Sequence, residues 1–293
     1  MRIFALELNN DIKGIGKRKE YIESLISQLP MPDLVLLPEL ALPSYMPNHK
    51  VWEYADDSSK KTSNWAMGLA KKYSCYVGVG YVDYDRGDYY NRYLIADENQ
   101  VYGTVTKSEG EAAVFKRGRF DNIIKTPFGN VAVAICYDSR RKNLYKNIKD
   151  EKISLIIFPH GSPADPKKEF EEIAANDYLC NLYSETFGVP VVYINSSGKL
   201  EYMPGIMGFL MKLSGFSMNG KSKIYASTGI SIETKLEEAQ GYDLILLEEE
   251  RKRDMVFYGN DLIKGNYFFR QMILKPDIGI GIRKYNKLLK RIK

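Results

Sequence analysis

The sequence predicts an α/β protein in which helices cover two stacked mixed sheets. Short runs rich in β-branched residues alternate with longer segments whose apolar residues recur every three or four positions, which is typical of strands alternating with helices. Two strand pairs are joined by short turns, so the sheets are expected to be mixed rather than wholly parallel. About a dozen strand candidates exceed what one open sheet usually holds, which favours two sheets packed face to face.

The first third of the chain alternates strands with helices. Three apolar runs are typical of buried strands: 2–8, 33–39 and 76–82. A helix is predicted over 17–29, because apolar residues recur on one face and Pro30 closes it. A second helix precedes the third strand and carries three aromatic or aliphatic residues on one face: Trp65, Leu69 and Tyr73.

Strands dominate the remainder of the predicted core. Two hairpin-like pairs are expected, the first from 90–97 and 101–107 around the turn 98–100, and the second from 122–129 and 130–136. A long helical pattern spans 170–186. Five further apolar runs are predicted strands: 154–159, 189–195, 222–227, 230–235 and 242–248.

The chain is predicted to form one large domain with an arm. Its 293 residues lie near the upper size for a single hydrophobic core, so we assign 1–250 to one domain. A charge run at 249–254 marks a change of character, and 251–293 is interpreted as a C-terminal arm. This arm is too apolar for a free tail, so we expect it to pack on a partner subunit. Its large apolar residues are Tyr258, Tyr267, Phe268, Phe269 and Met272.

Composition argues against several classes of function. The net charge of +5 is modest, and the basic cluster at 283–293 lacks the interleaved aromatics of a single-strand nucleic-acid surface. No apolar run is long enough to span a membrane, and the first residues resemble a strand rather than a secretion signal, so a cytoplasmic protein is expected. Three cysteines without a CxxC pair argue against a disulfide framework or a zinc site.

Three residues whose side chains could take part in catalysis each follow an apolar strand. Cys136 ends the run 130–136, Glu39 closes 33–39, and Lys107 ends 101–107. In stacked α/β layers such strand ends can converge, and open sheets place their active crevices there. A thiol, a carboxylate and an ammonium together would supply a nucleophile, a base and an oxyanion stabiliser. Alone, each residue would be ordinary, and Cys75 and Cys180 are interpreted as small buried hydrophobes.

These segments together resemble the nitrilase superfamily of carbon–nitrogen hydrolases. The matching motifs are LLPEL at 36–40, Lys107, and AICYDSR at 134–140, with weaker similarity at 155–163, 189–198 and 214–229. The resemblance runs in order from residue 1 to about residue 247. It implies a four-layer αββα sandwich for the 1–250 domain, a catalytic Glu–Lys–Cys set, and a homodimer. Each motif is weak alone, and the ordered series carries the resemblance.

Two departures from the family's pattern affect the site. Residues 108–110 read Ser-Glu-Gly where the family usually has His-Leu soon after the lysine. A second family glutamate commonly follows that lysine; Glu111 is the candidate here, with Glu109 as its rival. After Arg140 the chain continues Arg-Lys-Asn instead of the frequent Phe-Pro-Glu, so the substrate of any relative does not transfer directly.

The resemblance implies hydrolysis of an amide or N-carbamoyl bond through a thioester on Cys136, with Glu39 as base, Lys107 as oxyanion stabiliser and Glu111 positioning the water. It implies no metal and no organic cofactor, and a small-molecule substrate. A papain-like mechanism would need a histidine beside the thiol, and only His49 and His160 exist. The alternatives are a nitrile substrate, acyl transfer to an amine, and a catalytically silent scaffold of the same fold.

The predicted substrate pocket draws on residues near these strand ends. We expect Tyr45, Tyr137, Arg140 and His160 to line it, together with the loop 196–206. Arg140 is a weak indication of a substrate carboxylate, although pairing with an acidic neighbour is the stronger interpretation. His160 is interpreted as a second-layer contact, and His49 is assigned to the surface.

Overall fold

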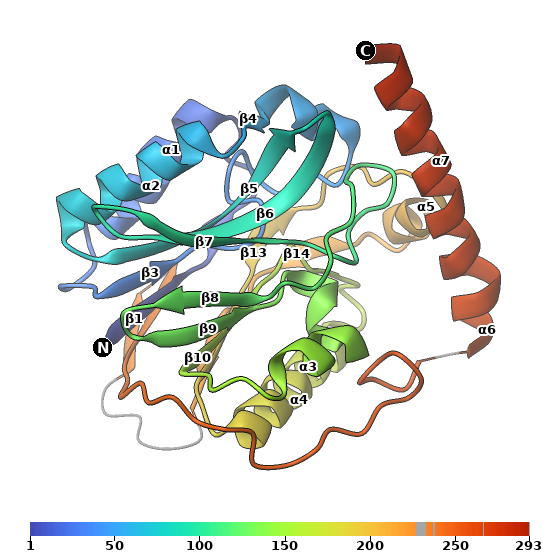
Figure 1. Cartoon of the computed structure of the whole chain (residues 1–293). Coiled ribbons are helices and arrows are strands. Elements are labelled where there is room, and N and C mark those ends of the chain that lie inside the picture. The colour runs from blue at the N-terminus through green and yellow to red at the C-terminus, as the bar shows by residue number, and fades with distance from the viewer. Residues whose placement is uncertain (227–232, 237, 266, 293) are drawn as a thin grey trace.

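Two mixed sheets form the centre of the molecule (Figure 1). The computed structural model describes residues 1–226, 233–236, 238–265 and 267–292. The first sheet has the order β16 (Glu233–Leu236), β17 (Ala239–Asp243), β1 (Arg2–Leu6), β3 (Leu34–Leu36), β5 (Tyr76–Asp85), β6 (Asp88–Ala96) and β7 (Val101–Thr106), with β4 (Asp56–Asp57) beside β5. The second has the order β15 (Lys223–Tyr225), β12 (Val191–Ile194), β10 (Leu155–Pro159), β9 (Gly129–Val133) and β8 (Ile123–Thr126).

Both sheets combine parallel and antiparallel pairs. In the first, β1, β3 and β5 are parallel while β6 and β7 continue antiparallel. In the second, β9, β10 and β12 are parallel while β8 and β15 close the two edges antiparallel. A small additional sheet, which the sequence does not predict, joins four short strands: β11 (Pro163–Ala164), β14 (Ser217–Asn219), β13 (Ser196–Lys199) and β2 (Leu8–Asn9).

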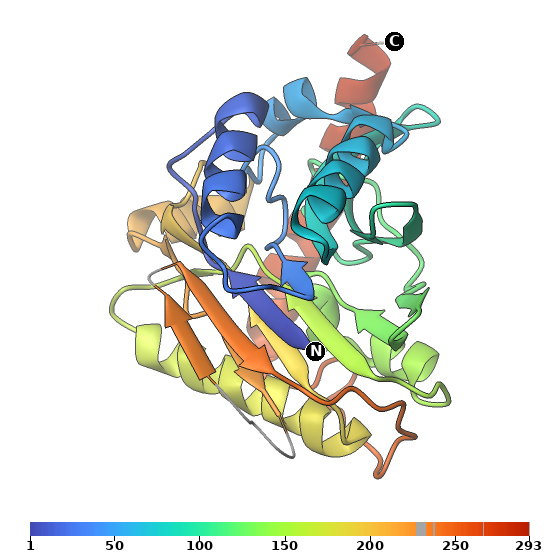
Figure 2. The same cartoon turned by 90° about the vertical axis from the view of Figure 1, so that its left-hand side faces the viewer.

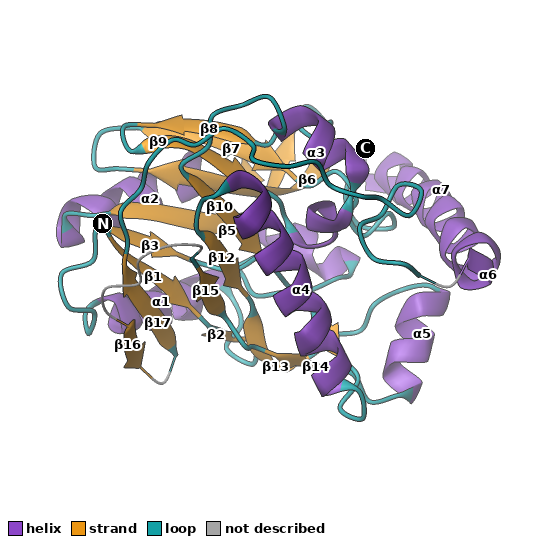
Figure 3. Cartoon of the chain, turned by 90° about the horizontal axis from the view of Figure 1, so that it is seen from below, coloured by secondary structure: helices purple, strands orange, loops and turns teal. Residues whose placement is uncertain are grey.

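Helices cover the outer face of each sheet, which confirms the predicted four layers. On one side lie α1 (Ile15–Ile26) and α2 (Lys60–Tyr73); on the other lie α3 (Lys142–Ile148) and α4 (Glu169–Phe187). Figure 2 shows the blue and cyan helices on one side of the sheets and the yellow α4 on the opposite side. Figure 3 gives the same layers from below.

Alternate side chains of a strand point into different hydrophobic cores, one between a sheet and its helices and one between the two sheets. Phe4 of β1 faces α1 and α2, where it packs with Ile22 and Leu69, whereas its neighbour Ile3 faces the second sheet. This alternation is the period-two pattern of a strand with both faces buried. The core between the sheets is mostly aliphatic and closely packed, which holds the two sheets in a fixed relation and so positions the residues at their ends.

Most predicted elements are present with shifted ends. The run 2–8 divides into β1 and β2, and the helix predicted over 17–29 is α1, which ends at Ile26. The strands predicted at 222–227 and 230–235 correspond to β15 and β16, although residues 227–232 lie outside the described part of the chain.

The three strands that carry the candidate site end earlier than predicted. β3 ends at Leu36, β7 at Thr106 and β9 at Val133. Glu39, Lys107 and Cys136 therefore stand on short segments after the strands, because the chain leaves the ladder there to bring them together.

The arm at 251–293 is more structured than its composition suggested. It contains α6 (Tyr267–Phe269), a π-helical turn η3 (Arg270–Leu274) and the long helix α7 (Lys275–Ile292). In Figures 1 and 3 α7 stands along one edge of the sandwich beside α5 (Ile206–Leu213). Tyr285 and Leu289 of α7 are buried against the domain of the same chain. Packing of the arm on a partner subunit remains a prediction.

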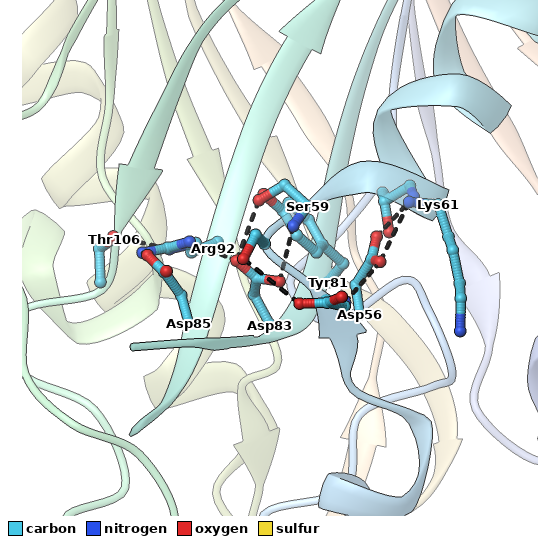
Figure 4. A network of polar contacts seen from close by, with 11 residues as sticks. Asp56, Ser59, Lys61, Tyr81, Asp83, Asp85, Arg92 and Thr106 are labelled. Atoms are coloured by element: carbon cyan, nitrogen blue, oxygen red, sulfur yellow. Dashed lines mark hydrogen bonds and ion pairs between the residues drawn. The ribbon is translucent and has the colours of Figure 1, made fainter. Parts of the chain in front are cut away.

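A polar network fixes the start of α2 to the first sheet (Figure 4). The carboxylate of Asp56 accepts hydrogen bonds from the backbone N–H groups of Lys61 and Thr62, at 3.0 and 2.6 Å. Asp83 of β5 accepts one from the N–H of Ser59 at 2.8 Å and pairs with Arg92 of β6. These bonds satisfy amide donors that the first turn of a helix leaves without partners.

Candidate active site

The three candidate residues meet at one end of the two sheets. β3 and β7 run in the same direction, because β5 is parallel to β3 and β6 reverses the chain between β5 and β7. Glu39 and Lys107 consequently leave the first sheet at the same edge. Gly80 of β5 makes room for the Glu39 segment, since a Cβ there would lie 2.4 Å from the carbonyl oxygen of Pro38.

Glu39 and Lys107 form a buried ion pair. The Lys107 Nζ lies 2.5 Å from Oε1 of Glu39, and both side chains are almost fully shielded from solvent. Asn91 donates its side-chain amide to the same oxygen at 2.6 Å, and the N–H of Gly161 donates to Oε2 at 2.7 Å. A buried carboxylate requires such partners, which here fix its orientation.

Glu111 completes the charged cluster. Its two carboxylate oxygens lie 3.0 and 3.3 Å from Lys107 Nζ, and it accepts a hydrogen bond from the Tyr45 hydroxyl at 2.7 Å. The rival Glu109 points elsewhere and pairs with Arg117 at 3.1 Å and Arg141 at 3.3 Å. Of the two glutamates left open by the sequence, Glu111 is the one that contacts the lysine.

Cys136 opens a short 3-10 helix, η2 (Cys136–Arg140), after β9. Its backbone φ is 52°, a left-handed value that is uncommon for residues other than glycine and costs free energy that neighbouring packing must offset. The thiol is half-buried, and burial raises its pKa to about 12. The negative charges of Glu39 and Glu111 act in the same direction, while Lys107 opposes them. The sulfur is therefore a thiol at neutral pH and needs a base to become a nucleophile.

The electrostatic environment separates the roles of the two glutamates. Burial raises the pKa of Glu39 above its ordinary value, with Lys107 opposing and Glu111 adding to the rise. For Glu111, burial is outweighed by Lys107 and the Tyr45 hydroxyl, so its pKa is lowered. Burial would lower the pKa of Lys107, but the two carboxylates hold it well above its ordinary value. Of the two carboxylates, Glu39 is therefore the one whose pKa suits a proton acceptor, and it lies beside a cation and a second carboxylate whose charges are maintained.

Asp138 ties the cysteine segment to the lysine segment. Its buried carboxylate accepts hydrogen bonds from the backbone N–H groups of Ser108 and Glu109, at 2.8 and 2.7 Å. Burial raises the pKa of Asp138 to about 7, and the two N–H donors partly offset that rise. Lys107 follows a strand of the first sheet and Cys136 follows a strand of the second. The Asp138 carboxylate links these two segments and so fixes their relative position.

Sequence reasoning missed one residue of the site entirely. Asn91 lies inside the predicted strand 90–97, where a polar residue alternating with others gives no reason to expect contact with Glu39. Asp138 lies within the cysteine motif at 134–140, and the sequence predicts no role for it. A buried asparagine in an apolar strand is the indication that could have identified Asn91, because its amide needs a polar partner.

The four predicted pocket residues have different surroundings. Tyr45 belongs to the charged cluster through Glu111. Tyr137 donates its hydroxyl to Asp261 at 3.0 Å. Arg140 pairs with Glu172 at 3.4 Å, which agrees with the interpretation that it has an acidic neighbour.

His160 is buried and neutral. Burial lowers its pKa well below the ordinary value, and the cations Arg140 and Lys107 lower it further. Its ring lies 4.6 Å from that of Tyr193, centroid to centroid. Within the described part of the chain neither ring nitrogen has a hydrogen-bond partner. The other histidine, His49, is exposed at the start of the 3-10 helix η1 (His49–Tyr54), where a surface residue was expected.

A cavity of about 470 Å³ adjoins the charged cluster. Its wall includes Glu111, Tyr137 and Arg140 from the site, together with residues of α5, of the loop before it and of the C-terminal arm. Met203 and Pro204 bring in the predicted loop 196–206.

Among the described residues, no cluster of three or more His, Cys, Asp or Glu side chains has the arrangement of a metal site. None of the described helices is long and apolar enough to cross a membrane.

Comparison with known proteins agrees with this architecture. The sequence model of the carbon–nitrogen hydrolase family matches residues 8–246. A probable nitrilase from Schizosaccharomyces pombe is 25% identical over 242 residues, which cover 79% of this chain and 81% of that protein.

Solved structures share the fold at low sequence identity. A carbon–nitrogen hydrolase from Helicobacter pylori superposes with a TM-score of 0.67 at 17% identity, covering 83% of this chain and 88% of the other. An amidase from Nesterenkonia superposes with a TM-score of 0.62 at 16% identity, covering 85% and 91%. Both likenesses show that the sandwich of this chain is the fold of those proteins.

Proposed function

The chain belongs to the carbon–nitrogen hydrolase family, and from that premise we propose that it hydrolyses an amide or N-carbamoyl bond through a thioester on Cys136. The observation that carries this proposal is the buried cluster in which Glu39, Lys107 and Glu111 act together on the Cys136 thiol. A raised glutamate pKa beside a protonated thiol is the arrangement that a base-activated nucleophile requires.

In the first half of the proposed reaction the carbon–nitrogen bond breaks. Glu39 takes the proton of Cys136 as the sulfur attacks the carbonyl carbon and forms a carbon–sulfur bond. The carbonyl oxygen acquires negative charge, which the ammonium of Lys107 and the N–H of Tyr137 stabilise. When the tetrahedral adduct collapses, Glu39 returns its proton to the departing nitrogen, and a thioester remains on the enzyme.

In the second half water cleaves the thioester. Glu39, again a carboxylate, accepts a proton from the water that attacks the carbonyl carbon, and Glu111 orients that water. The carbon–sulfur bond then breaks, and the proton on Glu39 returns to Cys136. The same glutamate therefore serves as base and acid in each half, which its raised pKa suits.

The test is replacement of the nucleophile. Cys136→Ala should abolish ammonia release from a panel of primary amides and N-carbamoyl compounds, and Cys136→Ser should nearly abolish it. Cys75→Ala is the matched control, because that thiol is buried at another place in the first core. Full activity of Cys136→Ala, or no activity of the wild-type protein on the whole panel, would overturn the proposal.

A nitrile substrate is the second candidate, favoured by the similarity to a protein described as a probable nitrilase. The two candidates differ in the bond that the thiol attacks, so paired nitriles and amides with the same side group separate them. Hydroxylamine added to the same assays reports acyl transfer, and absence of all turnover would favour a silent scaffold.

We further propose that the protein is a cytoplasmic homodimer to which the arm at 251–293 contributes. The arm exposes large apolar side chains in the single chain, which is typical of a surface that another subunit covers. Cell fractionation tests the location.

A further inference from the structure

The cavity beside the charged cluster takes much of its wall from outside the matched family region. That region ends at residue 246, whereas eight lining residues belong to the arm between 261 and 278. The opposite wall comes from α5 and the loop before it, through Met203, Met207 and Met211. The arm is therefore part of the pocket that opens on Glu111 and Tyr137, not an appendage remote from it.

The arm is fastened to the nucleophile's own segment. The N–H of Leu262 donates to the carbonyl of Arg140 at 2.9 Å, and the N–H of Lys142 donates to the carbonyl of Asn260 at 3.1 Å. Between these bonds the buried Asp261 accepts from the Tyr137 hydroxyl and pairs with Arg270 at 3.1 Å. Tyr137 follows Cys136 directly, so the position of the arm and that of the catalytic segment are fixed together.

A second attachment joins the arm to α5. The carboxylate of Asp277 in α7 accepts hydrogen bonds from the N–H groups of Ile206 and Met207, at 3.0 and 3.2 Å, and so caps the first turn of α5. Gly205 has a φ of 99°, and a Cβ there would lie 2.6 Å from Asp277 Oδ1. α7 also approaches the Glu111 segment closely, since a Cβ on Gly281 would lie 3.0 Å from the nitrogen of Ala113.

The wall between these attachments is chiefly apolar. The three methionines of the α5 side share the cavity with four arm residues: Ile263, Phe269, Leu274 and Ile278. The cavity also has three arginines, and each has an acidic partner on the protein: Arg117 with Glu109, Arg140 with Glu172, and Arg270 with Asp261. These cations are already neutralised, so the cavity favours an uncharged group over a substrate carboxylate. Methionine side chains adapt to ligands of irregular shape.

We propose that this cavity is a subsite for an apolar substituent of the substrate, so that the enzyme selects amides with a side group of about the size of a pentyl chain over acetamide. The inference rests on the proposed function, because it specifies the substrate class of the same site. Burial of each methylene against the methionine and arm wall should raise kcat/KM about fourfold. The substituent is carried either by the carbonyl carbon or by the leaving nitrogen.

The first experiment compares kcat/KM across primary amides from acetamide to hexanamide. The wild-type enzyme should prefer hexanamide by about a hundredfold or more, since four added methylenes enter the subsite. In Met207→Gln the hexanamide-to-acetamide ratio should fall by about tenfold. Leu213→Gln is the matched control on the same helix, because Leu213 is 69% exposed and does not line the cavity. It should leave the ratio unchanged.

N-pentylacetamide carries the same pentyl group on the leaving nitrogen instead of the carbonyl carbon. Its hydrolysis, assayed as acetate release, tests that second attachment point. A preference in either series that Met207→Gln diminishes supports the subsite. Absence of any size preference in both series, or an unchanged ratio in Met207→Gln, would overturn it.

A binding measurement separates failure of this inference from failure of the proposed function. Calorimetric titration of Cys136→Ala with hexanamide requires no turnover. Binding that is weakened about tenfold by adding Met207→Gln, but not by adding Leu213→Gln, supports the subsite even if the wild-type protein hydrolyses none of the amides. If the wild-type protein turns over acetamide and hexanamide equally while Cys136→Ala binds neither more tightly, the hydrolase stands and the subsite is refuted.

Discussion

At the scale of single residues, identical side chains acquire different chemistry from their surroundings. Glu39 and Glu111 both contact the Lys107 ammonium. Glu39 is enclosed more completely, so its pKa is raised, whereas the Tyr45 hydroxyl and Lys107 lower that of Glu111. Two carboxylates whose pKa values are displaced in opposite directions around one ammonium agree with the proposed division into a base and an electrostatic partner.

The raised pKa of Glu39 predicts the acid side of the pH profile. Glu39 is a base only when deprotonated, so kcat/KM should fall as pH decreases through its pKa, with a midpoint above the ordinary value of 4.5. Glu39→Gln should lower kcat by about 10²- to 10⁴-fold and remove that limb from whatever activity remains. Glu98→Gln, in an exposed turn, is the control. A limb at or below 4.5, or one that persists in Glu39→Gln, would show that another group is the base.

Asp138 gives a residue-scale prediction that concerns position rather than proton transfer. In Asp138→Asn one of the two N–H groups of Ser108 and Glu109 faces an amide NH₂ instead of an oxygen, leaving a buried donor without an acceptor. We expect a loss of about 1–3 kcal/mol in the free energy of unfolding, measured by urea titration, and a lower kcat.

The control for this loss is Asp150→Asn, whose side chain is exposed and should change neither quantity. Asp138 is proposed to act by positioning Lys107 and Cys136. The pH dependence of Cys136 alkylation by iodoacetamide should therefore differ between Asp138→Asn and the wild-type protein. Unaltered stability together with an unaltered alkylation profile would contradict a positioning role.

At the scale of elements, the start of α2 depends on a side chain outside the helix. Asp56 accepts a hydrogen bond from the N–H group of Lys61, as Figure 4 shows, and a second from that of Thr62. Asp56→Ala should cost about 1–2 kcal/mol of unfolding free energy. Burial raises the pKa of Asp56, but these N–H bonds outweigh it, so the pKa is lowered overall. The stabilisation is therefore present at neutral pH and is lost as pH falls through the folded-state pKa.

Thermal unfolding of wild-type and Asp56→Ala proteins at several pH values measures that difference. The gap in Tm should narrow at acid pH. Asp57→Ala is the control, because the neighbouring carboxylate is solvent-exposed and pairs only loosely with Lys60 at 3.8 Å. A gap that widens on acidification would mean that Asp56 is not the charged cap.

Elements were predictable where a strand is buried on both faces and unpredictable where tertiary contacts decide. The run 154–159 became β10 almost without change because continuous apolar character suffices there. For 283–293 the sequence leaves a solvated helix and a tail as alternatives. α7 begins earlier, at Lys275, where Gly279 and Gly281 weaken the helical pattern although Pro276 in the first turn is a recognised helix start.

The same distinction holds for the candidate site. Glu39, Lys107 and Cys136 could be proposed from the sequence because each follows an apolar strand within an ordered series of motifs. Asn91 and the arm could not, because their contacts with the site join segments far apart in the chain. No local pattern encodes that Asp261 would accept a hydrogen bond from Tyr137.

At the scale of the whole molecule, the arm has two faces with different surroundings. On one face, Tyr285 and Leu289 are packed in a core with Trp52. The rings of Tyr285 and Trp52 make a T-shaped contact there, with their centroids 5.8 Å apart. The other face presents Phe268 and Met272, which are 68% and 60% exposed. Removing the arm at 254 would therefore remove one wall of the cavity beside the charged cluster and part of a core, as well as any subunit contact, so truncation cannot isolate a role in assembly.

Substitution of the exposed face isolates it. The double variant Phe268→Glu with Met272→Glu should shift the protein from dimer to monomer in sedimentation velocity at micromolar concentration, because two carboxylates would be buried without partners in the interface. Circular dichroism should stay unchanged, since both side chains are exposed in the single chain. Ile245→Glu, an equally exposed apolar position outside the arm, should leave the dimer intact. A monomeric wild-type protein, or a double variant that dimerises as strongly as wild type, would refute the arm as a subunit contact.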